Sequence, residues 1–311
     1  MKPKLVLPGG SGFLGTALAR AFSRDGWDVV VLSRRAAPPA GSVRTVAWDG
    51  RTPGPWADEL DGAAAVINLA GRSIACLHTP EHRREILASR VDSVRAIAAA
   101  AARCRQPPPV LVQASAIGVY GNPGDRICEE GSPAATDFMA EVVSTWEAAF
   151  FSGGPAGGPR RVALRSGVIL GREGGALPPL IRLTRAFLGG TAGSGRQYLS
   201  WLHVGDFCQA CLWVTHRPES AGIYNVTGPA PVPNAAFMRE LRQVLGRPWS
   251  PPAPAWALAL AARFVLRVEP SLILAGCRAV PRRLLAEGFA FRYPALAPAL
   301  RDLTGPAPDR A

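Results

Sequence analysis

The chain has 311 residues, 48% of them hydrophobic, and a formal net charge of +12 at pH 7. This length and apolar content allow a large buried core and exclude an intrinsically disordered protein. The basic residues are nearly all arginines spread along the chain, without a basic run that alternates with aromatic residues, so we do not expect a nucleic acid as partner. The opening residues lead directly into an apolar strand, so we expect no signal peptide and a cytoplasmic location.

A glycine-rich turn follows the first predicted strand. Residues 5–7 are typical of a buried parallel strand, and helical apolar periodicity begins at Phe13. Glycine tolerates unusual dihedrals, and the free N–H groups at a helix N-terminus favour a phosphate. The sequence therefore predicts a dinucleotide pyrophosphate site, with a glycine turn that binds no ligand as the alternative. The predicted cofactor contacts are Gly9, Ser11, Gly12, Phe13, Leu14 and Gly15.

The second predicted strand, 28–32, ends in Ser33, Arg34 and Arg35. In a dinucleotide-binding fold this strand end meets the adenosine ribose, where a carboxylate would hold the 2′-hydroxyl of NAD. A hydroxyl and two guanidinium groups can instead bind a 2′-phosphate through paired donors. The sequence therefore favours NADP over NAD as the cofactor; the alternative is two solvated arginines after a strand.

Further strands of the same sheet are predicted at 43–48, 64–68 and 110–114, with a long helix at 80–104. The strand 64–68 is followed by residues that let a cofactor pass close to the backbone. The strand 110–114 delivers residues 115–121 to the carboxyl edge of the sheet, where ligands bind in such folds. The cofactor contacts expected at these two strand ends are Leu69, Ala70, Gly71 and Ala114.

Distinct short motifs are distributed over almost the whole chain. They are the glycine turn, 68–71, Ser89-Arg90, 115–121, Trp146-Glu147, Arg165 with Gly171, 174–176, 193–195, 201–206 and 291–294. With these motifs the chain resembles the extended short-chain dehydrogenase/reductases of the sugar-nucleotide epimerase type. More closely, it is similar to an atypical epimerase-like branch of uncertain function. The resemblance implies that Glu85 and Arg90 approach the nucleotide, although a surface ion pair is the alternative. It also implies that Ile169 lies near the nicotinamide end.

The resemblance fails at the catalytic helix. Active members of the wider family carry Tyr-x-x-x-Lys there, in which the tyrosine is the general acid/base and the lysine lowers its pKa. The matching helix is 137–150, and its two possible registers place Phe138 with Val142, or Met139 with Val143, at these positions. The standard dyad is therefore absent.

Ser115 and Tyr120 are the remaining candidates for catalysis because they follow the fifth strand. In the wider family, however, the tyrosine at this place usually shapes the substrate pocket. His203 is a weaker candidate, for which a structural role is favoured. Arg182, Arg185 and Arg196 are candidates to meet an anionic substrate, with a solvated surface as an equal alternative.

The later part of the chain completes the sheet and forms a smaller lobe. Strands are predicted at 161–165, 198–202 and 223–226, and proline-separated helices follow residue 234. Cys208 and Cys211 are interpreted as small buried residues of one helix, and we expect no metal site. The segment 256–268 comes nearest to a membrane span, but arginines interrupt it, so we expect no membrane partner.

We therefore predict a doubly wound, Rossmann-type α/β fold with a small, mostly helical C-terminal lobe. The expected NADP-binding domain is 1–172, with its sheet completed by 198–228, and the smaller lobe is 173–197 with 229–311. Two functions are weighed: an NADP-dependent oxidoreductase or epimerase of unusual chemistry, and a non-catalytic NADP(H)-binding sensor or regulator. The expected partner is a small-molecule substrate such as a nucleotide-sugar or another carbonyl compound. The sequence leaves open whether the chain forms a homodimer.

Overall fold

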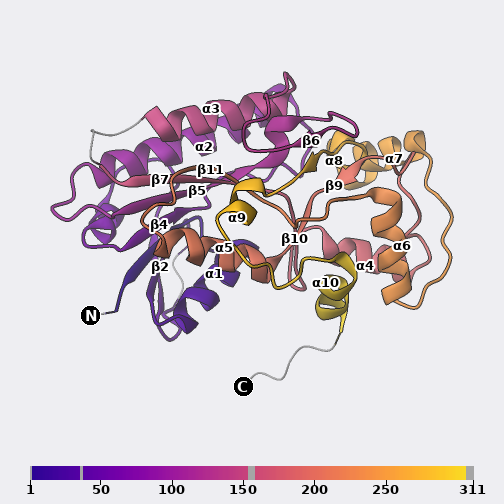
Figure 1. Cartoon of the computed structure of the whole chain (residues 1–311). Coiled ribbons are helices and arrows are strands. Elements are labelled where there is room, and N and C mark those ends of the chain that lie inside the picture. The colour runs from indigo at the N-terminus through magenta and orange to yellow at the C-terminus, as the bar shows by residue number, and fades with distance from the viewer. Residues whose placement is uncertain (1, 36–37, 153–157, 306–311) are drawn as a thin grey trace.

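A seven-stranded parallel sheet forms the centre of the protein (Figure 1). The structure, a computed structural model, describes residues 2–35, 38–152 and 158–305. The strands lie in the order β11-β7-β5-β4-β1-β2-β3, and every neighbouring pair is parallel. Their bounds are β1 Lys4–Pro8, β2 Asp28–Ser33, β3 Val43–Ala47, β4 Ala65–Asn68, β5 Val110–Ala116, β7 Arg160–Ser166 and β11 Gly222–Val226.

Helices cover both faces of this sheet, as Figure 1 shows. α1 (Phe13–Arg24) and α5 (Val204–His216) lie on one face, and α2 (Pro80–Ala101) and α3 (Phe138–Ser152) on the other. Side chains alternate between the faces of a strand, so Leu5 and Leu7 belong to the same core cluster as Phe22 of α1, whereas Val6 belongs to the cluster that contains Trp146 of α3. Burial on both faces explains why these strands are continuously apolar in sequence.

The strand order reverses between β1 and β4. From β1 the chain proceeds outward to β2 and β3, then returns across β1 to form β4 and continues in the other direction. In open α/β sheets, ligands bind beyond the carboxyl ends of the strands at such a reversal. The predicted doubly wound fold is confirmed, and it directs attention to the residues that follow β1, β2, β4 and β5.

The remaining elements form a smaller, mostly helical lobe. Its core lies between β8 (Val168–Leu170), β10 (Trp201–His203) and the helices α4 (Leu177–Arg185), α6 (Asn234–Val244) and α10 (Leu296–Thr304). Residues 306–311, which the sequence assigns to this lobe, lie outside the described residues.

Short elements complete the molecule. The predicted strand at 198–202 divides into β9 (Tyr198–Leu199) and β10, because β9 pairs with β12 (Val232–Pro233) and β10 with β8, outside the large sheet. β6 (Ile127–Cys128) pairs with β13 (Arg278–Ala279). The short helical elements are η1 Pro55–Leu60, η2 Ile117–Tyr120, α7 Ala255–Leu260, η3 Ala261–Leu266, α8 Ser271–Leu274 and α9 Arg282–Ala286. Within the described ranges, no helix is both long and apolar enough to cross a membrane.

Candidate functional site

The glycine turn between β1 and α1 is fixed by two close backbone contacts. Gly9 has a φ of +74°, and a Cβ there would lie 2.7 Å from the Cα of Ala70. A Cβ on Gly15 would lie 2.2 Å from the carbonyl oxygen of Gly10, so only glycine fits at either position. Gly12 differs, because it is the N-cap of α1, the place of a Cβ is open, and no described side chain caps the helix. The first N–H groups of α1 are thus available to an anion beside the ends of β1 and β4.

Phe13 connects this turn to a second glycine segment. A Cβ on Gly171 would lie 2.3 Å from Cζ of the Phe13 ring, and one on Gly174 would lie 2.6 Å from its Cγ. This segment follows β8, whose Ile169 is largely buried. Because the Phe13 ring packs against Gly171 and Gly174, the predicted cofactor contact of Phe13 would come from its backbone.

The end of β2 lies beside the glycine turn, since the N–H of Gly9 donates to the carbonyl oxygen of Leu32 at 2.8 Å. Ser33 is buried, and its hydroxyl accepts from the N–H of Arg35 at 3.4 Å. Arg34 and Arg35 are exposed. Two exposed arginines therefore follow the strand end that lies beside the glycine turn, and guanidinium groups can bind a phosphate.

Asn68 shapes the turn after β4. Its Nδ2 donates to Oγ of Ser93 at 3.1 Å and to Oε1 of Gln113 at 2.9 Å, and its Oδ1 accepts from the N–H of Ala70 at 3.0 Å. These bonds hold the backbone against which Gly9 packs. This role could not be assigned from sequence, because Ser93 and Gln113 are 25 and 45 residues away from Asn68 along the chain.

Arg90, on α2, lies beside Gly71, where a Cβ would be 3.2 Å from its Cζ. Its Nη1 donates to the carbonyl oxygens of Arg72 and Ile86, both at 3.0 Å, and its Cζ lies 5.1 Å from the ring centroid of Trp146. Burial lowers the pKa of Arg90 to about 10. The contacts that the structure records for this cation are carbonyl oxygens and a ring rather than a carboxylate, so an anionic ligand would stabilise it.

Glu85 lies one turn earlier on α2, where it forms an ion pair with Arg72. Its side chain is half exposed. Ser89 supports the same segment, because its hydroxyl accepts from the N–H of Arg72 at 2.9 Å. Glu85 therefore belongs to the rim next to Arg90, and the structure does not bring it to the glycine turn.

Ser115, at the end of β5, belongs to a buried polar network. Its hydroxyl donates to Oε1 of Glu147 on α3 at 2.6 Å. Arg165 on β7 binds the same carboxylate through both oxygens, at 2.9 Å from Nε and 2.7 Å from Nη2. Burial alone would lower the pKa of Arg165, but its hydrogen bond and charge interaction with Glu147 outweigh burial and raise it. The three side chains form one buried unit in which both carboxylate oxygens accept hydrogen bonds.

Tyr120 extends the network toward the smaller lobe. Its hydroxyl donates to Oδ1 of Asn225 at 2.7 Å and accepts from Nη1 of Arg165 at 3.0 Å. Nδ2 of Asn225 donates to the carbonyl oxygen of Val280 at 3.0 Å. Tyr120 is 1% exposed, and burial raises the pKa of its hydroxyl. The structure thus brings the two predicted catalytic residues into one network, without testing whether they act in catalysis.

Three further residues join this network, Glu147, Arg165 and Asn225, and none of them was assigned a role from sequence. The sequence does mark Glu147 as unusual, because it is a carboxylate on an otherwise apolar face of α3. Asn225 is likewise a polar residue in an apolar strand. Their partners, and that of Arg165, come from separate segments and could not be paired from sequence.

The helix that carries the dyad in the wider family is apolar here at the corresponding positions. Val142 and Val143 are fully buried. Phe138 lies below the guanidinium of Arg83, and Met139 lies next to Gly118, where a Cβ would be 3.6 Å from the Met139 Cβ. Neither register offers a phenol or an amine, since the only lysines of the chain are Lys2 and Lys4.

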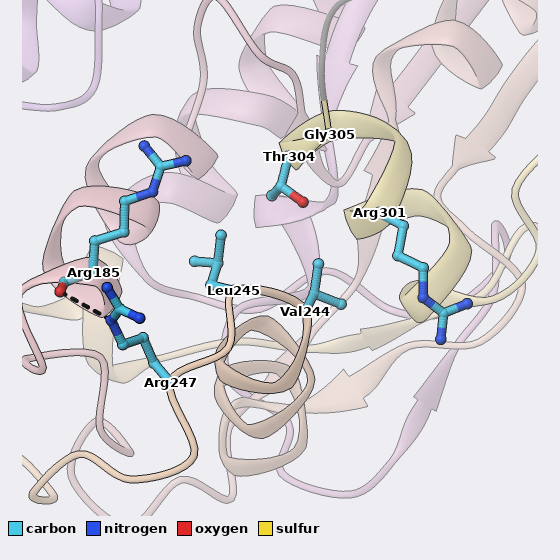
Figure 2. Close-up of a pocket in the computed structure, with 7 residues that line it drawn as sticks. All are labelled: Arg185, Val244, Leu245, Arg247, Arg301, Thr304 and Gly305. Atoms are coloured by element: carbon cyan, nitrogen blue, oxygen red, sulfur yellow. Dashed lines mark hydrogen bonds between the residues drawn. The ribbon is translucent and has the colours of Figure 1, made fainter.

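Of the arginines predicted to meet an anionic substrate, Arg182 and Arg185 lie three residues apart in the last turn of α4, whereas Arg196 lies outside this helix. Arg185 lines a shallow pocket of about 400 Å³ between α4, α6 and α10. Figure 2 shows Arg185 and Arg247 on one side of this pocket and Arg301 on the other, with Nε of Arg247 donating to the carbonyl oxygen of Arg185 at 3.4 Å. Arg196 is exposed, and its Nη2 lies 3.9 Å from Oδ2 of Asp125. The pocket and the glycine turn are separate features of the fold.

Comparison with known proteins agrees with this architecture. Residues 5–141 match the model of the NAD dependent epimerase/dehydratase family, and residues 253–303 match a domain of unknown function, DUF1731. The chain is 35% identical over 306 residues to the epimerase family protein YfhF of Bacillus subtilis, covering 96% of this chain and 97% of that protein.

Solved structures also resemble this fold over most of the chain. The human epimerase family protein SDR39U1, crystallised with NADPH, is 30% identical with a TM-score of 0.85, over 96% of this chain and 98% of that chain. MoeE5 in complex with UDP-glucose and NAD is 20% identical with a TM-score of 0.72, over 96% of this chain and 97% of that chain, a likeness of fold alone.

Proposed function

The chain belongs to the epimerase family that includes SDR39U1 and YfhF, and we propose that it binds NADP(H) and acts as an oxidoreductase or epimerase without the Tyr-x-x-x-Lys dyad. One observation carries the cofactor assignment: the N-terminus of α1 is uncapped and open at Gly12, at the strand-order reversal. The human relative crystallised with NADPH supports the same assignment.

The residues around the turn fit a phosphorylated dinucleotide. The N–H groups of α1 would bind the pyrophosphate, and Arg34 and Arg35 the 2′-phosphate. Arg90 would supply a further cation, with Glu85 at the rim. The proposed contacts are Gly9, Ser11, Gly12, Phe13, Leu14, Gly15, Ser33, Arg34, Arg35, Leu69, Ala70, Gly71, Glu85, Arg90, Ala114 and Ile169.

A bound nicotinamide supplies hydride transfer, and the chain must supply the proton. Ser115 and Tyr120 stay the proposed catalytic residues. Each would have to leave an existing partner in order to give a proton, Glu147 for Ser115 and Asn225 for Tyr120. The buried network would hold both residues beside the carboxyl end of β5.

The same network supports a second candidate, a non-catalytic NADP(H)-binding sensor or regulator. Tyr120 is sealed from solvent and Ser115 is 3% exposed, as expected of residues that stabilise a fold. In the enzymatic alternative the substrate is a small molecule, either a nucleotide-sugar or another carbonyl compound. A cytoplasmic location is part of both proposals.

Gly12→Ala tests the cofactor site directly. The added methyl group meets no protein atom within 4 Å, so the variant should fold with at most about 1 kcal/mol lost from the N-cap. It should nevertheless weaken NADPH binding by about tenfold or more in calorimetric titration, because the methyl group would occupy the phosphate site. Gly131→Ala is the matched control, since its Cβ place is also open. Unchanged NADPH affinity in Gly12→Ala would remove the proposed pyrophosphate site.

A second experiment separates the two functions. The purified protein is loaded with NADPH deuterated at the transferable hydride and incubated with a metabolite extract, which is then searched by mass spectrometry for labelled products. Label in a product establishes an enzyme. Bound NADPH without label, together with no conversion of deuterated candidate sugars into epimers or oxidised products in the presence of NADP⁺, favours the sensor.

A further inference from the structure

The helical segment α7–η3, residues 255–266, leaves most of its apolar side chains in solvent. Ala262 is its only buried residue within the described structure. Five large apolar residues are exposed, at fractions of 69% for Trp256, 51% for Leu260, 69% for Phe264, 78% for Val265 and 60% for Leu266. Figure 1 shows α7 at the outer edge of the smaller lobe, away from the large sheet. A helix that is apolar around its circumference normally lies in a protein core or in contact with lipid.

The exposed residues form a continuous face with a protruding tip. Trp256, Leu260 and Phe264 follow one another at intervals of four residues, and therefore share one side of the helix. At its end, Phe264, Val265 and Leu266 are consecutive and exposed. Arg263 and Arg267 flank them, and Arg267 closes the helix with a left-handed φ of +54°. Both arginines are exposed.

The charged residues of the chain segment that carries this face are all positive. Between Glu240 and Glu269 the chain has four arginines, Arg242, Arg247, Arg263 and Arg267, and no acidic residue. Glu269 itself is engaged at the base of the helix, where its carboxylate accepts from the N–H of His78 at 3.2 Å. The whole chain, these arginines included, carries a net charge of +12. The face is therefore complementary to a surface that is both apolar and anionic.

We propose that α7–η3 docks on the surface of an anionic lipid bilayer, with its aromatic and aliphatic face in the interface and Arg263 and Arg267 at the headgroups. Arginine stems can bury alongside apolar groups while their charges stay at the headgroups. At about 1.5 Å per residue the segment is about 18 Å long, against about 30 Å of hydrocarbon, so it lies in the membrane plane and does not span it. A second copy of this chain fits the face less well, because it would bring the same arginines together.

This inference departs from the sequence-based expectation of no membrane partner. That expectation judged 256–268 only as a possible span, which the arginines exclude. An interfacial helix requires those arginines, and its recognition depends on side-chain exposure. The proposal is independent of the proposed NADP(H) site, which lies at the large sheet.

The test is co-sedimentation of the purified full chain with sucrose-loaded vesicles, one set of pure phosphatidylcholine and one with about 30% phosphatidylserine. Binding is expected to the anionic vesicles and to fall with added salt. The double variant Phe264→Ser/Leu266→Ser should lower the partition coefficient by about 100-fold, at about tenfold for each apolar side chain withdrawn from the interface. Arg263→Glu/Arg267→Glu should lower binding to the anionic vesicles by about tenfold or more.

Leu285→Ser is the matched control, because this leucine is 48% exposed on α9 and should not alter vesicle binding. Circular dichroism and the thermal midpoint confirm that each variant is folded. No binding of the wild-type chain to anionic vesicles would overturn the proposal, as would equal loss in Leu285→Ser. Conversion of a wild-type dimer to a monomer by Phe264→Ser/Leu266→Ser, with no vesicle binding, would assign the face to a second copy instead.

Discussion

Replacing Glu147 by glutamine should strongly destabilise the protein, although the two side chains have nearly the same shape. Glu147 is 5% exposed and Arg165 is 7% exposed. The carboxylate accepts one bond from Ser115 and two from Arg165. An amide would present N–H donors to a guanidinium that is itself only a donor, and the buried positive charge of Arg165 would lose its counter-charge.

The expected loss follows from these contacts. Breaking a buried ion pair from one side typically costs about 3–5 kcal/mol, which for a chain of this size corresponds to a fall of about 5–8 °C in the thermal midpoint. The double variant Glu147→Leu/Arg165→Met removes both charges, so it should lose only about 1–2 kcal/mol. This loss comes from the hydroxyl of Ser115, which loses its acceptor, and from that of Tyr120, which still donates to Asn225 but loses the bond that it accepts.

The assay is urea and thermal denaturation followed by circular dichroism. Glu141→Gln is the matched control, since Glu141 lies on the same helix and is exposed, and the midpoint should stay within about 1 °C. The reasoning is refuted if Glu147→Gln costs less than about 1 kcal/mol, or if the double variant is less stable than the single variant.

Three further predictions concern the cofactor, the reaction and pH. Arg34→Asp should weaken NADPH binding by about 10-fold or more while leaving NADH binding within about threefold, and equal losses would contradict a 2′-phosphate contact. Ser115→Ala and Tyr120→Phe should each abolish any reductase activity that the labelling experiment finds, and unaffected turnover would remove that residue from the mechanism. Burial lowers the pKa of His203, and this effect outweighs the nearby charge of Asp302, which would raise it. The unfolded chain therefore takes up the proton more readily than the folded one, so stability is lost as the pH falls below about 6.5. His203→Asn keeps an acceptor for the N–H of Gly205, so its thermal midpoint should fall less than that of the wild type between about pH 7 and pH 5, and a parallel fall would exclude His203 as the source.

The sequence by itself determined the large sheet and the place of the glycine turn. Both depend on neighbouring residues: an apolar strand, glycines at 9, 12 and 15, and helical periodicity from Phe13. The same local information predicted a last strand of the sheet at 223–226, and the structure confirms that β11 belongs to this sheet; its position at the edge, next to β7, comes from the structure. Local dihedral preference and side-chain periodicity are enough for such features because they operate within a few residues.

Only the tertiary structure decided which polar side chains meet. Ser115 and Glu147 are 32 residues apart in sequence, and Tyr120 and Asn225 are 105 apart. The strands β5, β7 and β11 bring them to one edge, and burial then requires each polar group to find a partner. No spacing rule in the sequence connects residues across such distances.

The solvent exposure of residues 256–268 was likewise decided only by the tertiary structure. Residues 256–268 are as apolar as a core helix, and their sequence is compatible with burial against the smaller lobe. The structure instead packs α4, α6 and α10 around β8 and β10, and that core is complete without α7–η3. Because hydrophobic burial is non-directional, sequence identifies which side chains favour leaving water, whereas the packing of the other elements decides which of them the fold itself can cover.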